Sequence, residues 1–393
     1  MKRVISFLLA SLGLASTFAQ NGTGFVGDGY YRVCNYATKR YIYVTDNKDY
    51  YDMSHDAGDF QAIQLWKDIT RAVPDPASVI YIDETDYGFD LRAQGTGTYS
   101  LTGRYMHVTK QRNGTYEVSA TAKGVTKYLS DSEQSSSEQG TMSTSGTGDY
   151  RKWIVDKLTT DHATNYFGIK PTIQLNGKYY QPFYAAFPFK TASSDMHVYY
   201  ISQVEWDLAL LQEIEGEIPA NTPVIIECAS DNPSQNRLEL LTSSSAKVTG
   251  NKLSGLYFCN GMRPKESVDA YTKFDGATMR IFSVNDGKLV LTNDAPERLK
   301  EIKTIDWSTN KVVKVKSLPA NTSYFKTNVN TPGVIELTTD PTVIADGIAD
   351  INAESKAAQG VYTLSGTQLR ADNSINGLPA GLYIVGGKKV IKN

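Results

Sequence analysis

The residues best suited to chemistry in this 393-residue chain are few and far apart. The sequence contains no H-E-x-x-H zinc motif, no G-x-S-x-G nucleophile elbow and no G-x-x-x-x-G-K-[ST] phosphate loop. Its histidines and cysteines also lack metal-ligand spacing; they are His55, His107, His162, His197, Cys34, Cys228 and Cys259. We therefore expect no catalytic residue, no metal site and no cofactor, and a protein that is not an enzyme.

Two groups of reactive residues leave alternatives open. The acidic cluster of Asp83-Glu84 and Asp86 is typical of a solvated loop, whereas a glycan-cleaving enzyme would need two carboxylates facing each other across a sugar. Cys228 and Cys259 could form a disulfide in an oxidising compartment or remain buried thiols.

Residues 1–19 have the three parts of a secretory signal peptide. Lys2 and Arg3 form the positive start, residues 4–14 are apolar, and Thr17-Phe18-Ala19 is a small-x-small cleavage site. No later segment has the roughly 18 consecutive apolar residues that a membrane-spanning helix needs. We expect a secreted or outer-membrane surface protein without a transmembrane segment.

The composition excludes some partners and indicates the fold class. Lys plus Arg number 40 against 42 Asp plus Glu, so the chain lacks the basic excess that binds nucleic acid or an anionic membrane. Its 25 Tyr recur in short alternating runs with Val and Ile, such as Tyr41–Val44, which predict strands of a mainly β protein. Asn113-Gly114 is expected to form a turn between two such strands. One helix is expected over Gln61–Arg71, ended by Pro74 and Pro76.

Residues 20–160 form the first predicted domain. The segments GYYRVCN at 29–35 and TKRYI at 38–42, together with the Gln-x-Trp at 64–66, resemble ricin-type β-trefoil lectin modules. The resemblance implies a trefoil-like barrel of short strands, although the Gln-x-Trp signature occurs once rather than three times.

The same resemblance implies a way of binding sugar. In such modules an aromatic ring stacks on a pyranose while Asp and Asn side chains bind its hydroxyl groups. The residues that match this scheme are Tyr43, Asp46, Asn47 and Tyr50, in and just after the second strand. In the alternative interpretation Tyr43 only covers a strand and Asp46-Asn47 only forms a turn. The expected partner is a glycan or a host or surface protein.

Residues 165–338 are predicted to form a β-sandwich. The phrase Ile-Pro-Ala-Asn-Thr at 218–222 returns as Leu-Pro-Ala-Asn-Thr at 318–322, each time between strand-like runs. In such a turn Pro restricts φ and Asn tolerates the left-handed conformation. With Phe187-Pro188-Phe189 ahead of them, these turns resemble β-rich domains of surface and secreted Bacteroidetes proteins, which implies a sandwich but no chemistry.

Residues 344–393 carry two short hairpin patterns, at 360–369 and 381–392. Together they resemble the C-terminal sorting domain of the type IX secretion system. The resemblance implies that the secretion machinery recognises this tail before it is cleaved or attached to the surface; the matching residues are Gly381, Leu382, Tyr383, Ile384, Val385, Lys388 and Lys389. The alternative is a small stabilising β-module.

These features predict a secreted or cell-surface, non-catalytic binding protein. Its parts are a trefoil-like N-terminal barrel, a central β-sandwich and a small C-terminal β sorting module, and we expect carbohydrate to bind to the first. One alternative is a structural or protein-interaction surface protein that binds no sugar. The other is a glycan-acting enzyme without a recognisable motif.

Overall fold

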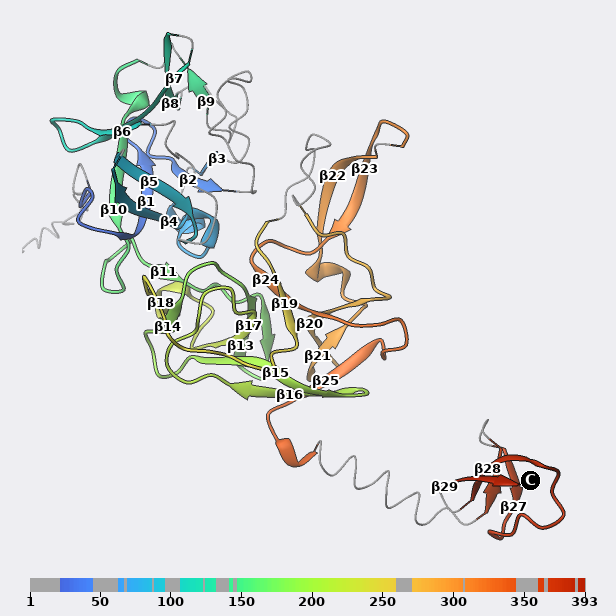
Figure 1. The fold of residues 1–393 in the computed structure, drawn as a ribbon. Helices are drawn as coiled ribbons and strands as arrows, with labels where there is room; N and C mark the ends of the chain where they lie inside the picture. The colour runs from blue at the N-terminus through green and yellow to red at the C-terminus, as the bar shows by residue number, and fades with distance from the viewer. Residues whose placement is uncertain are drawn as a thin grey trace, which may run out of the picture.

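Strands are the main regular structure of the protein in the computed structural model (Figure 1). The structure describes residues 22–44, 63–66, 69–86, 88–95, 107–122, 124–131, 141–143, 147–258, 271–306, 308–343, 360–363, 367–385 and 388–392. Helices within these ranges are short, such as α1 (Ile69–Ala72), and none is long and apolar enough to cross a membrane. The mainly β fold class expected from the alternating runs is confirmed.

The N-terminal module, residues 22–158, is a curled sheet built around β1 (Gly29–Asn35). β1 pairs antiparallel with β10 (Trp153–Lys157), with β4 (Ile80–Thr85) and, through Cys34, with β2 (Tyr41–Val44). The other strands are β3 (Ile63–Trp66), β5 (Gly88–Ala93), β6 (His107–Lys110), β7 (Tyr116–Ala122), β8 (Val125–Ser130) and β9 (Thr141–Ser143).

The neighbours of each strand in this sheet lead from β1 through β4, β5, β6, β7 and β10 back to β1. β4 pairs with β5, β10 with β7, and β7 with β6, while β5 and β6 contact each other. Tyr31, Tyr116 and Trp153 fill the inside of the curl, and the Trp153 indole donates a hydrogen bond to Leu129 O (3.0 Å). The tyrosine-rich runs are therefore mostly core strands rather than surface ribbons.

Two local predictions in this module have different outcomes. The helix expected over Gln61–Arg71 is wrong, because residues 63–66 pair with β2 as a strand and α1 is only four residues long. The ladder hydrogen bonds that Tyr41–Val44 offers outweigh the local helical pattern. The Asn113-Gly114 turn lies where expected, between β6 and β7, with Gly114 at a φ of 85°.

The middle region repeats one strand order twice. In the first copy, β13 (Lys178–Phe183), β17 (Val224–Cys228), β15 (His197–Glu205) and β16 (Leu208–Glu213) are neighbours in that order. In the second, β19 (Leu253–Leu256), β24 (Thr322–Lys326), β20 (Met279–Asn285) and β21 (Lys288–Thr292) follow the same order. β25 (Val334–Thr338) joins the copies, parallel to β16 and antiparallel to β21.

The two Pro-Ala-Asn-Thr turns occupy the same place in the two copies. Asn221 and Asn321 have φ values of 62° and 52°, so both adopt the left-handed conformation expected of them. The Asn221 amide donates to Ala185 O (3.0 Å), and the Asn321 amide donates to Tyr257 O (3.1 Å). The repeated phrase in the sequence therefore marks a repeated structure.

The two copies pack against each other as a sandwich. Their shared core includes Ile201 and Ile225 from the first copy and Phe282, Leu291 and Phe325 from the second. A smaller sheet packs on the first copy; its strands are β11 (Phe167–Gly168), β14 (Phe189–Thr191) and β18 (Arg237–Leu240). In the second half of the region, β22 (Lys300–Asp306) and β23 (Lys311–Ser317) form a separate two-stranded ribbon that projects from the sandwich in Figure 1. β12 (Ile173–Leu175) extends the main sheet beside β13. The expected sandwich-like architecture is confirmed.

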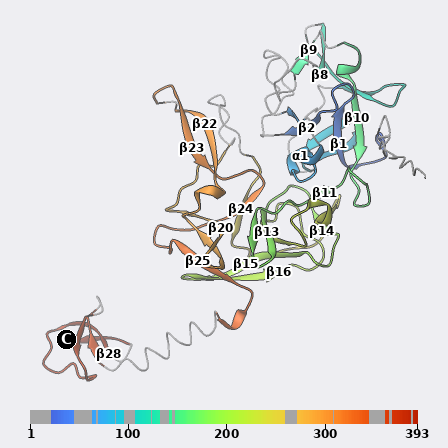
Figure 2. The ribbon, with the colours of Figure 1, turned by 180° about the vertical axis from the view of Figure 1, so that it is seen from behind.

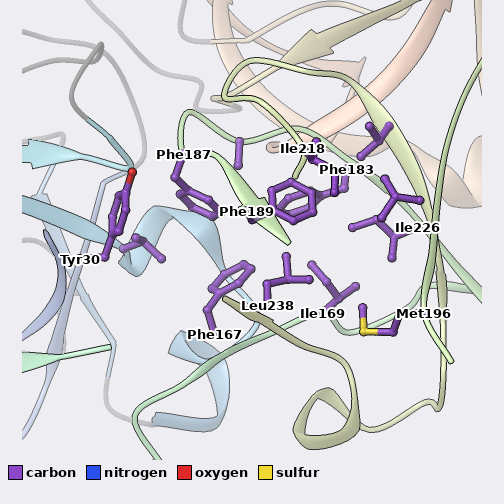
Figure 3. Packing of buried hydrophobic residues seen from close by; sticks show 14 of the residues in the cluster. Tyr30, Phe167, Ile169, Phe183, Phe187, Phe189, Met196, Ile218, Ile226 and Leu238 are labelled. Carbon is purple, nitrogen blue, oxygen red and sulfur yellow. The ribbon is translucent and has the colours of Figure 1, made fainter. Parts of the chain in front are cut away.

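The N-terminal module and the sandwich share buried side chains (Figure 3). Tyr30 of β1 meets Phe187 of the first copy, with ring centroids 5.8 Å apart. In return Phe258, which follows β19, belongs to the core of the N-terminal module. Gly95 permits the close approach, because a Cβ there would lie 2.5 Å from Ala186 O. The two parts are thus held together by packing and not only by the connecting chain.

Arg32 adds a polar connection at this junction. Its side chain is 1% exposed, and its guanidinium donates to Asn165 Oδ1 (2.9 Å) and to Tyr166 O (2.8 Å) from the start of the middle region. It also donates to Ala72 O (3.1 Å) and Val73 O (3.2 Å) of its own module. Burial lowers the pKa of Arg32 to about 10. Because Arg stays protonated at neutral pH, these neutral oxygens solvate a buried charge.

The C-terminal module is a separate sheet with the order β27-β26-β28-β29. Its strands are β26 (Val361–Tyr362), β27 (Gln368–Arg370), β28 (Gly381–Val385) and β29 (Lys388–Lys392). Val361 and Tyr383 are its buried apolar residues, and the Tyr383 hydroxyl donates to Pro379 O (2.8 Å). Both hairpins expected from the tail sequence are present.

Candidate functional site

The predicted sugar-binding residues fall partly outside the described structure. Tyr43 lies on β2, is 6% exposed and packs with Ala72 and Ala77. This burial differs from the exposed stacking ring that the resemblance implied. Asp46, Asn47 and Tyr50 lie outside the described residues.

The predicted sorting residues form one hairpin. Gly381, Leu382, Tyr383, Ile384 and Val385 make up β28, and Lys388 and Lys389 begin β29. Leu382 pairs across the hairpin with Ile391, and these two side chains are 40% and 73% exposed. The alternation therefore places Tyr383 on the buried face and Leu382 on the open face.

Two of the described histidines contact neighbouring polar groups, and the two described cysteines are buried. His162 Nδ1 accepts from the amide of Asn165 (2.7 Å), and His197 Nδ1 lies 2.6 Å from Glu213 Oε1. Cys34 and Cys228 are free and buried, and burial raises the pKa of each thiol to about 12. Cys259 lies outside the described residues. Across the described ranges, no three His, Cys, Asp or Glu residues gather as metal ligands would.

The acidic cluster is built differently from the expected loop. Asp83 and Glu84 lie within β4, and Asp83 stands opposite Asp90 on β5. Arg92 binds Asp90 at 2.8 Å and approaches Asp83 at 3.7 Å. Burial raises the pKa of Asp83, and the nearby Arg92 partly offsets that effect. A cation between the two carboxylates makes this an ion cluster within a hairpin.

A cleft opens where the two copies of the sandwich meet. We call it the seam cleft; it has a volume of about 400 Å³, within the usual range for ligand pockets, and its walls come from both copies. The first copy supplies Thr172, Gln181 and Pro182. The second supplies the residues Ile281, Phe282, Glu297, Arg298, Leu299, Lys300, Leu318, Pro319, Ala320, Thr322 and Ser323. One wall is therefore the second Pro-Ala-Asn-Thr turn.

Arg298 links the two walls of the seam cleft. Its guanidinium donates to Thr172 O and to Thr172 Oγ1, both at 2.6 Å, and Thr172 Oγ1 donates to Gln181 Oε1 (2.7 Å). The Arg298 Nε–H has no partner among the described residues. Among the described residues, Arg298 forms no ion pair with a carboxylate. Burial lowers the pKa of Arg298, and the charge of Glu297 partly offsets that effect. The cleft thus contains a cation with spare hydrogen-bonding capacity.

Further cations continue from the seam cleft along a two-stranded ribbon. Lys300 opens β22, and Lys303 stands directly opposite Lys314 of β23. Glu301 is the carboxylate among them, 2.7 Å from Lys314 Nζ and 3.9 Å from Lys316 Nζ. Like charges facing each other on a strand pair are unfavourable on their own. The arrangement suits an anionic ligand such as a carboxylate.

Sequence reasoning did not find the seam cleft. Thr172 and Arg298 are 126 residues apart, and no local motif connects them. The available signal was the repeated Pro-Ala-Asn-Thr phrase, because its second copy forms a wall of the cleft. A duplicated turn indicates two copies, and the seam between two copies is a natural place for a cleft.

Comparison with known proteins gives no relative. No family model matches the chain, and no curated protein matches it.

Proposed function

We propose that this chain is an exported, non-catalytic binding protein of the cell surface and that its seam cleft binds an acidic saccharide. The observation that carries the proposal is Arg298, a cation in a cleft of about 400 Å³ whose Nε–H has no partner among the described residues. Thr172 and Gln181 add hydroxyl and amide groups beside it, and Ile281 and Leu299 add apolar surface. A uronic acid offers the matching carboxylate, hydroxyl groups and apolar ring face.

The charge of the chain strengthens this choice. The whole protein has a formal net charge of −2, so a concentration of Arg298, Lys300, Lys303 and Lys314 at one place is a local feature. An acidic polysaccharide could place one carboxylate in the cleft and the next along the ribbon. Such binding weakens as salt screens the charges.

Binding to arrays of acidic and neutral oligosaccharides tests the proposal. Wild-type protein should bind polyuronates at low salt, and this binding should disappear at high salt. Arg298→Gln should weaken binding at least tenfold, and Lys300→Gln about two- to fivefold, because a partly exposed charge pair contributes about 0.5–1 kcal/mol. Lys190→Gln is the matched control, since Lys190 is an exposed lysine paired with Glu239 on the first copy. If the wild-type protein does not bind acidic glycans, the proposal is wrong and the alternative is a structural or protein-interaction role.

The N-terminal module is proposed to be trefoil-like and to bind carbohydrate through the loop after β2. Support comes from β1, which pairs with both β4 and β10, as the first strand of a closed barrel must. Tyr43 then supports the strand, and Asp46, Asn47 and Tyr50 supply the contacts. Asp46→Ala should reduce glycan binding by the N-terminal module. Lys300→Gln should still weaken binding to the seam cleft by the same factor in the Asp46→Ala protein as in the wild type.

Export is proposed to depend on the C-terminal hairpin. β28 and β29 form a complete two-stranded unit from Gly381 to Lys392, within a sheet that has its own buried residues Val361 and Tyr383. The secretion machinery is the proposed partner of this unit. Deleting residues 381–393 should abolish surface or medium accumulation while the remaining protein folds. Normal export of the truncated protein would rule out a sorting role.

A further inference from the structure

Trp206 lies in an unusual position at the tip of the hairpin between β15 and β16. Its side chain is 72% exposed. Among the residues that the structure describes, it is the one Phe, Tyr or Trp whose side chain is largely exposed. Figures 1 and 2 place this hairpin at the end of the sandwich away from β22 and β23, so the tip is distinct from the seam cleft.

The backbone at Trp206 is strained. Its φ is 50°, in the left-handed region, where a bulky side chain is a genuine outlier. Most other non-glycine residues of this protein with positive φ are Asn or Asp, including Asn176, Asp286 and Asn310, whose short polar side chains tolerate it. Among these residues, Trp206 has the bulkiest side chain and tolerates a positive φ least well.

The matching hairpin of the second copy closes with other residues and another backbone geometry: Asp286 and Gly287 both have positive φ, whereas in the first copy Trp206 does and Asp207 does not. The hairpin β20–β21 has the same place in the strand order and also a two-residue loop, Asp286-Gly287, between the paired Asn285 and Lys288. In the first copy Trp206-Asp207 stands between the paired Glu205 and Leu208. Asp286 and Gly287 suit a tight hairpin turn, as the second copy demonstrates. Local folding therefore explains Asp286 and does not explain Trp206.

Polar residues lie next to Trp206 in the chain and on the adjoining strands. Glu205 and Asp207 flank it in the chain, and the Glu336 amide donates to Asp207 O (2.7 Å), which brings β25 beside the tip. The Glu336 carboxylate binds Lys288 Nζ at 2.8 Å. An exposed ring at a hairpin tip, with carboxylates next to it in the chain and an ion pair on the adjoining strands, suits a pyranose. The ring can cover the apolar face of the sugar, and polar groups can bind its hydroxyls.

We propose that Trp206 is the stacking platform of a saccharide site for neutral sugars. Glu205 and Asp207 beside the ring disfavour acidic sugars, so the ligand differs in charge from that of the seam cleft. The strain at Trp206 is then retained because the ring serves binding.

Trp206→Asn distinguishes the effect of Trp206 on stability from its effect on saccharide binding. Asn tolerates the left-handed conformation, so the melting temperature should stay the same or rise, while binding to neutral oligosaccharides on an array should fall at least tenfold. Trp206→Tyr keeps an aromatic face and should retain part of the binding. Asp286→Asn on the duplicate hairpin is the matched control and should change neither property.

Protection of the ring gives an independent measurement. Neutral oligosaccharide should reduce acrylamide quenching of the wild-type fluorescence, and this reduction should disappear in Trp206→Asn while Lys300→Gln keeps it. Unchanged binding by Trp206→Asn, or wild-type protein that binds no neutral saccharide, overturns the proposal. If Trp206→Asn instead removes only the binding of a protein partner, the tip is a protein contact and the saccharide assignment is wrong.

Discussion

The Asn321 side-chain amide donates a hydrogen bond to Gln94 Oε1 at 2.9 Å and joins the sandwich to the N-terminal module across 227 residues of sequence. Both residues are buried and both have left-handed backbones, with φ values of 52° and 61°. Asn321 Nδ2 also donates to Tyr184 O (3.0 Å). Its counterpart Asn221 is exposed, so one copy of the turn only reverses the chain while the other also docks a second module.

This difference predicts unequal effects of one substitution at the two turns. Glycine accepts a positive φ, so Asn321→Gly keeps the turn but removes both side-chain bonds and leaves Gln94 Oε1 buried without its donor. We expect a loss of about 1–3 kcal/mol in the free energy of unfolding. Asn221→Gly, the matched control, should change it by a few tenths of a kcal/mol. Equal effects in urea denaturation would show that the Gln94 contact contributes nothing.

Arg32 should resist even conservative substitution. Lys has no planar fork, so Arg32→Lys cannot serve the oxygens of Asn165, Tyr166 and Ala72 together, and the protein should lose about 3 kcal/mol or more. Amide hydrogen exchange should accelerate at the junction near residues 72–78 and 165–168. Arg280→Lys is the control, because Arg280 is equally buried but bonds only within the second copy, to Pro332 O (2.7 Å) and Thr331 O (2.7 Å). Exchange at the junction should be unaffected in that variant.

Phe258 follows β19 in the chain, but it should stabilise the N-terminal module, in whose core it packs. Phe258→Ala removes a core side chain of the N-terminal module and should cost about 3–5 kcal/mol. Hydrogen exchange should increase around Tyr116 and Trp153, which share its cluster. Phe274→Ala, in the cluster of the second copy, should leave exchange in β7 and β10 unchanged. Unchanged protection at β10 in Phe258→Ala would show that the modules fold independently.

Asp75 should make stability depend on pH. Burial raises the pKa of Asp75 to about 6, against partial offsets from the Ala77 amide and the nearby Lys300. Because the folded state binds this proton more tightly than the unfolded state, stability is lost as pH rises from about 4 to about 6 and stays lower above that range. Asp75→Asn keeps an oxygen for the Ala77 amide, which Asp75 Oδ1 accepts at 2.8 Å, and removes the charge. Its melting temperature should exceed that of the wild type more at pH 8 than at pH 4.5.

Sequence patterns predicted the strands better than they predicted their partners. Tyr41–Val44 was expected as a strand and is one, because alternation reports the period of the pleat. Ile63–Trp66 was expected as helix, since its strand character arises from pairing with β2, which lies 19 or more residues away. Tyr43 shows the same limit at the level of a side chain. Its position on the strand was predicted, but α1 and the turn after it decide that its ring is covered.

By itself, the sequence determined the local features of this protein: alternating runs that form strands, Asn at turns that need positive φ, and tail hairpins whose apolar residues alternate. Each depends on residues that are near neighbours in the chain, where steric preference and periodicity act directly. Tertiary structure alone decided the order of strands around β25, the contact between Asn321 and Gln94, the cleft between Thr172 and Arg298, and the contrast between Trp206 and Asp286. These depend on groups about 40 or more residues apart, whose arrangement is decided only by burial and pairing of the whole chain.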